Sequence, residues 1–280
     1  MPDMILVEPF QLNLSTIGLG PPMNNTPAIY VQDSGGLGTG TANLVTNDPR
    51  EVWSSNSGGT TFNLWVDLGK DMQWDTIALI NTSFLPTATF LVDDGTQAQN
   101  SYYANLLVSG FVARVPSEDV ADANGPVVFV SATVRNSRYL TMNVTQPAGS
   151  PNFSIGRLIV GKSFRPSIWQ ETGGSFEQGA GRPMIDSGSR ERLSDGGLAT
   201  VSGRLISGFQ WVYGDLDSPD LAKLWGMFRR LRTTEPLLLV EGYGATVAEG
   251  VHYCTFASLE KYDRSQVNKS RWVFAVEDWL

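Results

Sequence analysis

The sequence is poor in the residues that build most catalytic and metal sites. Its 280 residues include one histidine, His252, and one cysteine, Cys254. An intramolecular disulfide is therefore excluded, and packing, hydrogen bonds or neighbouring subunits must stabilise the fold. A Ser-His-Asp triad or a multi-histidine metal site would have to depend on His252 alone. His252 and Cys254 share one face of an expected strand, and their side chains lie about 7 Å apart, too far for a direct proton relay.

Long apolar runs and positive charge are also scarce. No stretch approaches the roughly 20 apolar residues that span a bilayer, so we expect no membrane span. Residues 2–15, PDMILVEPFQLNLS, carry an acid where a secretory signal needs a base, and Glu8 and Pro9 interrupt the apolar run. Export by the general secretory pathway is therefore not expected. Lys and Arg number 20 against 28 Asp and Glu, and the net charge of -8 disfavours nucleic-acid binding.

Glycine and proline, in contrast, are abundant. The chain has 29 glycines and 15 prolines distributed among short apolar runs, which predicts a mainly β fold of many short strands. In residues 62–68, Leu64 and Val66 alternate with Asn63 and Trp65, the period of a half-buried strand. The strands expected in this way are residues 5–8, 62–68, 76–81, 87–92, 127–134, 138–144, 155–160, two around 201–212, 236–243, 251–259 and 271–280.

One segment has the pattern of a helix. Ser218 is the expected N-cap, Pro219 suits the first helical position, and Asp220 favours the positive end of the helix dipole. Apolar residues then recur at intervals of three and four: Leu221, Leu224, Trp225, Phe228 and Leu231. The sequence therefore predicts a helix over 219–232 that buries one face. The arginines of its last turn, Arg229, Arg230 and Arg232, either compensate the dipole and form salt bridges between subunits, or contact DNA.

The change in composition near residue 165 predicts a domain boundary. We expect an N-terminal strand or arm at residues 1–24, a β-sandwich at 25–165 and a second β domain at 166–280. Residues 171–189, ETGGSFEQGAGRPMIDSGS, are rich in glycine and serine. They are expected to form a long loop or arm that reaches a neighbouring subunit.

The first half carries an ordered series of short motifs. They are Asn47-Asp48, Trp53-Ser54-Ser55, Val66-Asp67-Leu68-Gly69, Trp74-Asp75-Thr76-Ile77-Ala78-Leu79-Ile80, Ser137-Arg138-Tyr139-Leu140-Thr141-Met142-Asn143-Val144 and Ile155-Gly156-Arg157-Leu158-Ile159-Val160-Gly161. In this order the series resembles the discoidin, or galactose-binding-like, domain over roughly residues 25 to 165. The resemblance implies a jelly-roll sandwich of two sheets.

In discoidin-like domains, ligands and sometimes calcium bind at loops at one end of the sandwich. The resemblance therefore implies a ligand site in two loops of this chain. Its candidate residues are Asn47, Asp48, Arg50, Asp93, Asp94, Asn100, Tyr102 and Tyr103. Carboxylate and amide oxygens suit calcium, and aromatic rings suit the faces of sugars; no other cofactor is expected. The alternative is that Asp48 only caps a turn, Trp53 fills the core and the tyrosines pack locally.

The order of elements in residues 166–280 also follows a known pattern. Its parts are Phe209-Gln210-Trp211, the helix, Pro236-Leu237-Leu238-Leu239-Val240 and Trp272-Val273-Phe274-Ala275-Val276-Glu277. This order resembles the ring-forming domain of phage distal tail proteins. The resemblance implies a closed homo-oligomeric ring, usually a hexamer, between the tail tube and the tail hub. Because the last strand has apolar residues on both faces, it is expected either in the interior of a sandwich or at an interface between subunits. Trp211, Trp272 and Phe274 are predicted to lie at that interface.

Paired acids and glycine-rich runs do not supply a catalytic site. Asp93-Asp94 and Glu277-Asp278 are adjacent on strands, so their carboxylates point opposite ways, unlike the acid pair of a glycosidase. The run GGLGTG at 35–40 lacks the lysine of a phosphate loop. The resemblance to distal tail proteins then implies a virion protein of a phage tail tip, made in the host cytoplasm, and we expect it to be non-enzymatic. Its sandwich is expected to face outward and to bind host-surface glycans or other tail proteins. The alternatives are an extracellular carbohydrate-binding adhesin exported by another route, and a hydrolase or its accessory domain.

Overall fold

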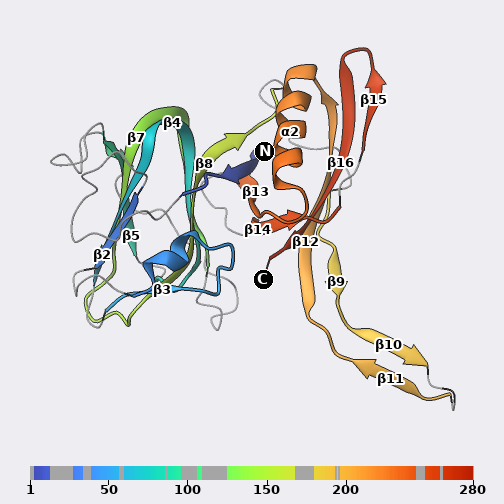
Figure 1. The fold of residues 1–280 in the computed structure, drawn as a ribbon, viewed down its shortest axis with the longest axis horizontal. Helices are drawn as coiled ribbons and strands as arrows, with labels where there is room; N and C mark the ends of the chain where they lie inside the picture. The colour runs from blue at the N-terminus through green and yellow to red at the C-terminus, as the bar shows by residue number, and fades with distance from the viewer. Residues whose placement is uncertain are drawn as a thin grey trace. The chain divides into compact units, whose positions relative to one another are not determined.

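The computed structural model describes residues 3–12, 28–33, 39–56, 60–85, 88–95, 106–108, 125–167, 180–192, 194, 196–243, 250–258 and 261–279. The chain forms two compact units (Figure 1). The sandwich unit comprises Val7–Ser163 and Gly244–Val251, and the C-terminal unit comprises Met1–Leu6, Phe164–Tyr243 and His252–Leu280. Met4 and Leu6 lie in the core of the C-terminal unit. The predicted N-terminal segment thus contains a strand, residues 3–9, and this strand is divided between the two units.

The structure confirms a mainly β fold, and the residues that it describes contain one α-helix. The elements of the first half are β1 (Asp3–Pro9), β2 (Ala28–Asp33), the 3-10 helix η1 (Thr41–Val45), β3 (Trp53–Ser54), β4 (Thr61–Thr82), β5 (Thr89–Gly95), β6 (Leu106–Val108), β7 (Val127–Thr145) and β8 (Ser154–Phe164). No helix in the described residues is long and apolar enough to cross a membrane.

Two long strands, β4 and β7, run through both layers of the sandwich. The sequence predicts two separate strands in place of each; the structure joins them. The first part of β4 pairs with β2 and with residues 139–145 of β7, and its second part pairs with β8 and with residues 127–130 of β7. Leu64 of the first part and Leu79 of the second lie in one apolar cluster. The two layers therefore enclose a single core, as in a jelly roll.

Two of the sequence motifs meet at a break in the pairing of β4 with β7, between Asp67 and Met72. Gly69 has a φ of +80°, a backbone conformation that glycine adopts without strain. Asp67 accepts the Gly69 N–H at 2.7 Å and two hydrogen bonds from Arg138, at 2.6 and 2.8 Å. Close by, the indole N–H of Trp74 donates to Ser137 Oγ at 2.9 Å. The motifs around Asp67 and Arg138 thus form one buried, charge-paired corner.

The C-terminal unit contains the helix and most of the remaining strands. Its elements are β9 (Met184–Asp186), β10 (Ser189–Arg192), β11 (Leu198–Val201), β12 (Leu205–Leu216), α2 (Ser218–Leu231), β13 (Leu237–Tyr243), β14 (Val251–Phe256), β15 (Tyr262–Gln266) and β16 (Lys269–Asp278). The sheet order is β13-β14-β16-β12-β9, with β15 also paired to β16. Helix α2 lies against this sheet in Figure 1.

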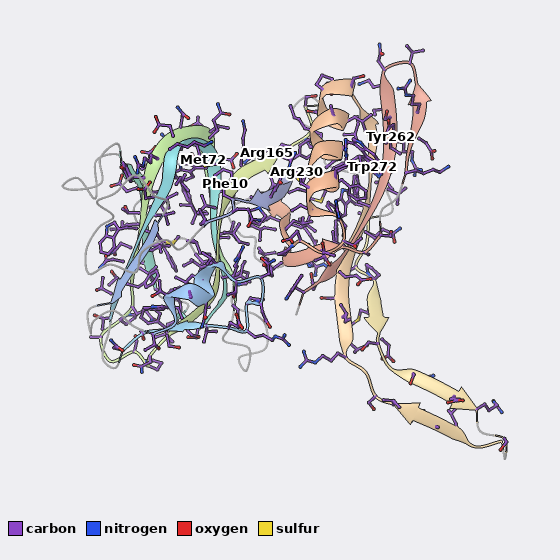
Figure 2. All side chains as sticks on the ribbon, in the orientation of Figure 1. Phe10, Met72, Arg165, Arg230, Tyr262 and Trp272 are labelled. Atoms are coloured by element: carbon purple, nitrogen blue, oxygen red, sulfur yellow. The ribbon has the colours of Figure 1, made fainter. Side chains whose placement is uncertain are left out.

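Helix α2 departs from its predicted form in two details. Its N-cap is Asp217, whose carboxylate accepts the Asp220 N–H at 2.8 Å, and Ser218 is already helical. Leu224, Met227, Phe228 and Leu231 are buried, whereas Trp225 is 38% exposed. The Trp225 ring still packs at the margin of the core, 5.7 Å from the ring of Tyr262 and 5.4 Å from that of Trp272, both labelled in Figure 2.

The predicted subunit-interface residues belong to the core of the chain itself. Trp211 and Trp272 are fully buried and Phe274 is 2% exposed. The Phe274 ring centroid lies 5.3 Å from that of Trp211 and 4.5 Å from that of Trp272, and Phe228 of α2 covers this row. The prediction is therefore wrong for these three side chains. The sequence pattern showed apolar positions, but the helix of the same chain covers them.

Candidate assembly surface and ligand loops

A long β-hairpin, residues 184–207, projects from the C-terminal unit (Figure 1). β9 pairs with the start of β12, from Met184↔Ser207 to Asp186↔Leu205, and β10 pairs with β11. This segment overlaps the arm predicted at 171–189. Residues 171–179 lie outside the described residues, but 184–186 and 189–192 are strands and not a loop. We call residues 184–207 the hairpin below.

A bulge bends the hairpin in the middle. Between the two paired parts, one side has residues 187–188 and the other 202–204, two residues against three. Ser187 closes the bend, since its hydroxyl donates to the Arg204 carbonyl at 2.9 Å and accepts the Arg204 N–H at 2.8 Å. A side chain on Gly203 would lie 2.0 Å from the Gly188 nitrogen. Glycine is therefore required where residue 203 passes close to Gly188, and the sequence is adapted to the bend.

Large apolar side chains stand exposed along the hairpin. Four of the seven exposed large hydrophobic residues of the described chain are there: Met184 (70%), Leu198 (60%), Val201 (67%) and Leu205 (64%). The register places Met184 and Leu205 on the same face. A two-stranded hairpin is marginally stable at best in water, and exposed apolar groups on it gain free energy when another surface covers them. The hairpin thus has the properties of a docking element.

A cluster of charged and polar side chains lies at the root of the hairpin. Arg182 donates two hydrogen bonds to Glu241, from Nε to Oε1 at 2.9 Å and from Nη2 to Oε2 at 3.0 Å. His252 lies 2.6 Å from the same Glu241 Oε1 through Nε2, and 2.8 Å from Asp278 Oδ1 through Nδ1. Ser207 donates to the other oxygen of Asp278. We call these five residues the root cluster.

The carboxylates of the root cluster decide the charge of His252. Burial disfavours the imidazolium, but the hydrogen bonds to Asp278 and Glu241 outweigh it and raise the pKa of His252 to about 9. Burial also tends to raise the pKa of Glu241, but its bonds to His252 and Arg182 hold that pKa below the ordinary value. At neutral pH the histidine is therefore a cation between two anions.

The predicted ligand residues of the first loop bond to one another. Arg50 donates to both oxygens of Asp48, at 2.8 and 2.6 Å, and its backbone N–H donates to Oδ1 at 3.0 Å. The hydrogen bonds from the Arg50 side chain and backbone lower the pKa of Asp48 to about 2. Asn47 lies beside this turn and makes contacts of its own. Asp48 therefore closes a local turn, and its carboxylate is occupied.

Asp93 and Asp94, two further predicted ligand residues, lie on strand β5 and not in this loop. Asp93 lies on β5, opposite Thr141 of β7, which in turn pairs with Trp65 of β4. The first loop instead packs against the far end of β4, where Asn81 donates to the Pro49 carbonyl at 2.8 Å. Asp93 and Asp94 are buried and have contacts. The remaining candidates, Asn100, Tyr102 and Tyr103, lie outside the described residues.

No cluster of three or more His, Cys, Asp or Glu side chains that could hold a metal ion occurs in the described ranges. Cys254 is buried in the core of the C-terminal unit, and burial raises the pKa of its thiol well above the ordinary value. His252 is committed to the root cluster. The pairing of His252 with Glu241 and Asp278 was missed in the sequence. The available signal was that each of these residues lies two positions beyond a core residue on its strand.

No family model matches the chain, and no curated protein sequence matches it. Among solved structures, a GH29 fucosidase from Ruminococcus gnavus in complex with fucose has 15% identity and a TM-score of 0.35, over 50% of this chain and 26% of that chain. The chain thus spans about a quarter of the length of that enzyme.

Two carbohydrate-binding modules match over nearly their whole length. The chitosan-binding module 1 of a chitosanase/glucanase from Paenibacillus sp. IK-5 has 16% identity and a TM-score of 0.37, over 55% of this chain and 98% of that chain. The family 32 module of Clostridium perfringens NanJ, in complex with galactose, has 12% identity and a TM-score of 0.34, over 48% and 92%.

Proposed function

We propose that this chain is a structural, self-assembling protein of a phage tail tip. Its C-terminal unit would form a ring of identical subunits between the tail tube and the tail hub, and its sandwich unit would attach host-surface glycans or other tail proteins. The observation that carries the proposal is the projecting hairpin with its exposed apolar residues. The order of the C-terminal elements, which resembles that of distal tail proteins, supplies the biological setting.

The hairpin favours a ring over a symmetric dimer. An arm that projects from one subunit docks on a different surface of the next, and such a heterologous interface either closes into a ring or grows into a filament. Exposed Val201 and Leu205 would be buried in that contact, and the open edges of β10 and β11 would be covered. A chain that works only as an assembled particle also has no need of a catalytic site.

Mass photometry of the full chain tests this proposal. A hexamer would have six times 30.5 kDa, about 183 kDa. A variant in which residues 187–204 are replaced by Asn-Gly keeps β9 and the start of β12 joined by a tight turn. We expect it to be monomeric, and Val201→Asn with Leu205→Asn to weaken the ring. Val267→Asn is the matched control, because Val267 is 91% exposed but lies on another turn. A natural chain that remains monomeric at micromolar concentrations would contradict the proposal.

A second function, carbohydrate binding by the sandwich, is favoured by one face of its sheet. Asn63 and Trp65 of β4 point to the same side as Asn143 and Thr141 of β7, and all four are half-buried. The Asn143 amide donates to Asn63 Oδ1. An indole ring beside amide groups is the usual chemistry of sugar recognition. We therefore propose this face, and not the Asp48 loop, as the glycan-binding surface.

Calorimetric titration with galactose, fucose and chitosan fragments separates the two surfaces. If the sheet face binds, Trp65→Ala should abolish the heat of binding while Asp48→Asn leaves it unchanged. The opposite result would restore the loop predicted from the sequence. Binding by a purely monomeric chain would support the alternative of a carbohydrate-binding adhesin over a tail protein. Circular dichroism of each variant controls for folding.

A further inference from the structure

Four polar residues of the root cluster extend rows of core residues. On β12, Phe209, Trp211 and Tyr213 face the core, and Ser207 is the next residue of that row. In the same way Asp278 follows Phe274 and Val276, Glu241 follows Leu237 and Leu239, and His252 precedes Cys254 and Phe256. Since side chains alternate along a strand, all four must meet where the core ends. That end is the place where the hairpin leaves the sheet.

The contacts connect the hairpin to three other strands. Arg182 and Ser207 stand on the two chain segments that enter the hairpin, since Gly181 bridges Gln210 and Met184 pairs with Ser207. Arg182 binds Glu241 of β13, and Ser207 binds Asp278 of β16. His252 of β14 joins these two carboxylates, and its ring stacks 6.1 Å from that of Phe209.

We infer that protonated His252 is an ionic clamp that fixes the root of the hairpin to the sheet of the C-terminal unit. With His252 protonated, Arg182 and His252 balance Glu241 and Asp278, and every charge of the cluster has a partner. Without that proton the cluster carries one uncompensated negative charge in a largely buried place. The two carboxylates would then repel, and the hairpin root would loosen.

The other ionisable groups near His252 do not replace the clamp. Glu277 is next to Asp278 on β16 and points to the opposite face, and the Cys254 thiol is buried and feels the charge of Asp278. Asp278 and Glu241 are thus the anions that face the imidazole of His252, and Arg182 is the cation on the far side of Glu241. The clamp also sets the direction in which the hairpin meets a neighbouring subunit. This link to assembly rests on the proposed function.

Hydrogen exchange of the full chain tests the clamp at the hairpin root, in peptides that contain residues 181–183 and 206–209. At pH 7 we expect His252→Gln to raise the exchange rate there by about tenfold or more, since the neutral amide cannot balance two carboxylates. Lys261→Gln is the matched control, because it removes the exposed Lys261–Asp263 pair of the same unit. Equal exchange in the two variants would overturn the inference.

The natural chain supplies a measurement that needs no variant. Exchange of the carbon-bound C2 hydrogen of the single histidine reports its own titration. We expect a midpoint near 9, with protection of the root peptides, corrected for intrinsic exchange, lost over the same pH range. A midpoint near 6.5 would contradict the clamp, and so would hydrogen-exchange protection of the root peptides that does not change as His252 titrates. Both results can be read even if His252→Gln fails to fold.

The outcomes separate the clamp from the ring. Both readouts above are local, so they can be positive in a chain that mass photometry shows to be monomeric; the clamp would then stand and the ring would fall. If the ring exists, we expect His252→Gln to lower the fraction of rings while Lys261→Gln does not. A ring that forms equally well with His252→Gln would remove the link between the clamp and assembly.

Discussion

At the scale of single residues, burial distinguishes two aspartate-arginine pairs. Asp48 and Arg50 are two residues apart, with side chains 33% and 62% exposed, and they form a surface turn. Asp67 and Arg138 are 71 residues apart, and the Asp67 side chain is fully buried. Ion pairs at the surface contribute little to stability, whereas breaking a buried pair leaves an uncompensated charge.

Arg138→Ala should therefore destabilise the sandwich unit by about 3 kcal/mol, because it leaves the buried Asp67 carboxylate without its main partner. Urea unfolding followed by tryptophan fluorescence measures this, since Trp53 and Trp74 are in that core. Arg50→Ala should leave the unfolding midpoint unchanged. If both variants unfolded at the same urea concentration as the natural chain, the Asp67–Arg138 corner would not be a stabilising element.

At the scale of elements, the start of helix α2 distinguishes what the structure shows from what the sequence predicted. Asp217→Ala should destabilise the C-terminal unit by about 1 kcal/mol, because it removes the carboxylate that accepts the Asp220 N–H. Ser218→Ala, at the N-cap position that the sequence suggested, should have almost no effect. Thermal unfolding of the two variants compares them directly. A larger loss for Ser218→Ala would mean that the serine is the cap.

The hairpin supplies a second test at this scale. Gly203→Val should disrupt the bend, because the first side-chain carbon would already collide with the Gly188 backbone. We expect loss of hydrogen-exchange protection in residues 184–207 with little change in the melting temperature of either core. Gly181→Ala is the control, since a side chain there meets no atom within 4 Å. Unchanged protection in Gly203→Val would show that the bulge adjusts at low cost.

At the scale of the whole molecule, each unit has its own core and only one contains the histidine. The folded pKa of His252, about 9, lies above the ordinary 6.5. Its contribution is therefore fully present below about pH 6.5 and is lost as the pH rises through 9. That contribution is at most about 3 kcal/mol.

A rise from pH 7 to pH 9.5 should accordingly lower the melting temperature of the C-terminal unit, while that of the sandwich unit changes less. Calorimetry at the two pH values measures both transitions. In His252→Gln the additional loss of melting temperature in the C-terminal unit should disappear. The other groups that titrate at high pH are present in both the natural chain and the variant. A C-terminal transition that shifts equally in the natural chain and in the variant would assign the effect to those other groups.

The sequence by itself determined the mainly β class, the position of the helix and most of the strands. These features follow from local periodicity and turn residues, which act on the backbone wherever the segment lies. It also identified apolar rows such as Trp272 and Phe274. It did not determine what covers them, and a helix of the same chain does so in place of a neighbouring subunit.

Only the tertiary structure decided which distant residues meet. It joined the predicted strands into β4 and β7, brought Asp67 to Arg138, and paired Asp93 of β5 with Thr141 of β7. It also placed His252 between Glu241 and Asp278. The physical reason is the same in each case: a strand pattern tells which face is apolar, while register and topology decide which strand lies opposite and therefore which charges must be paired.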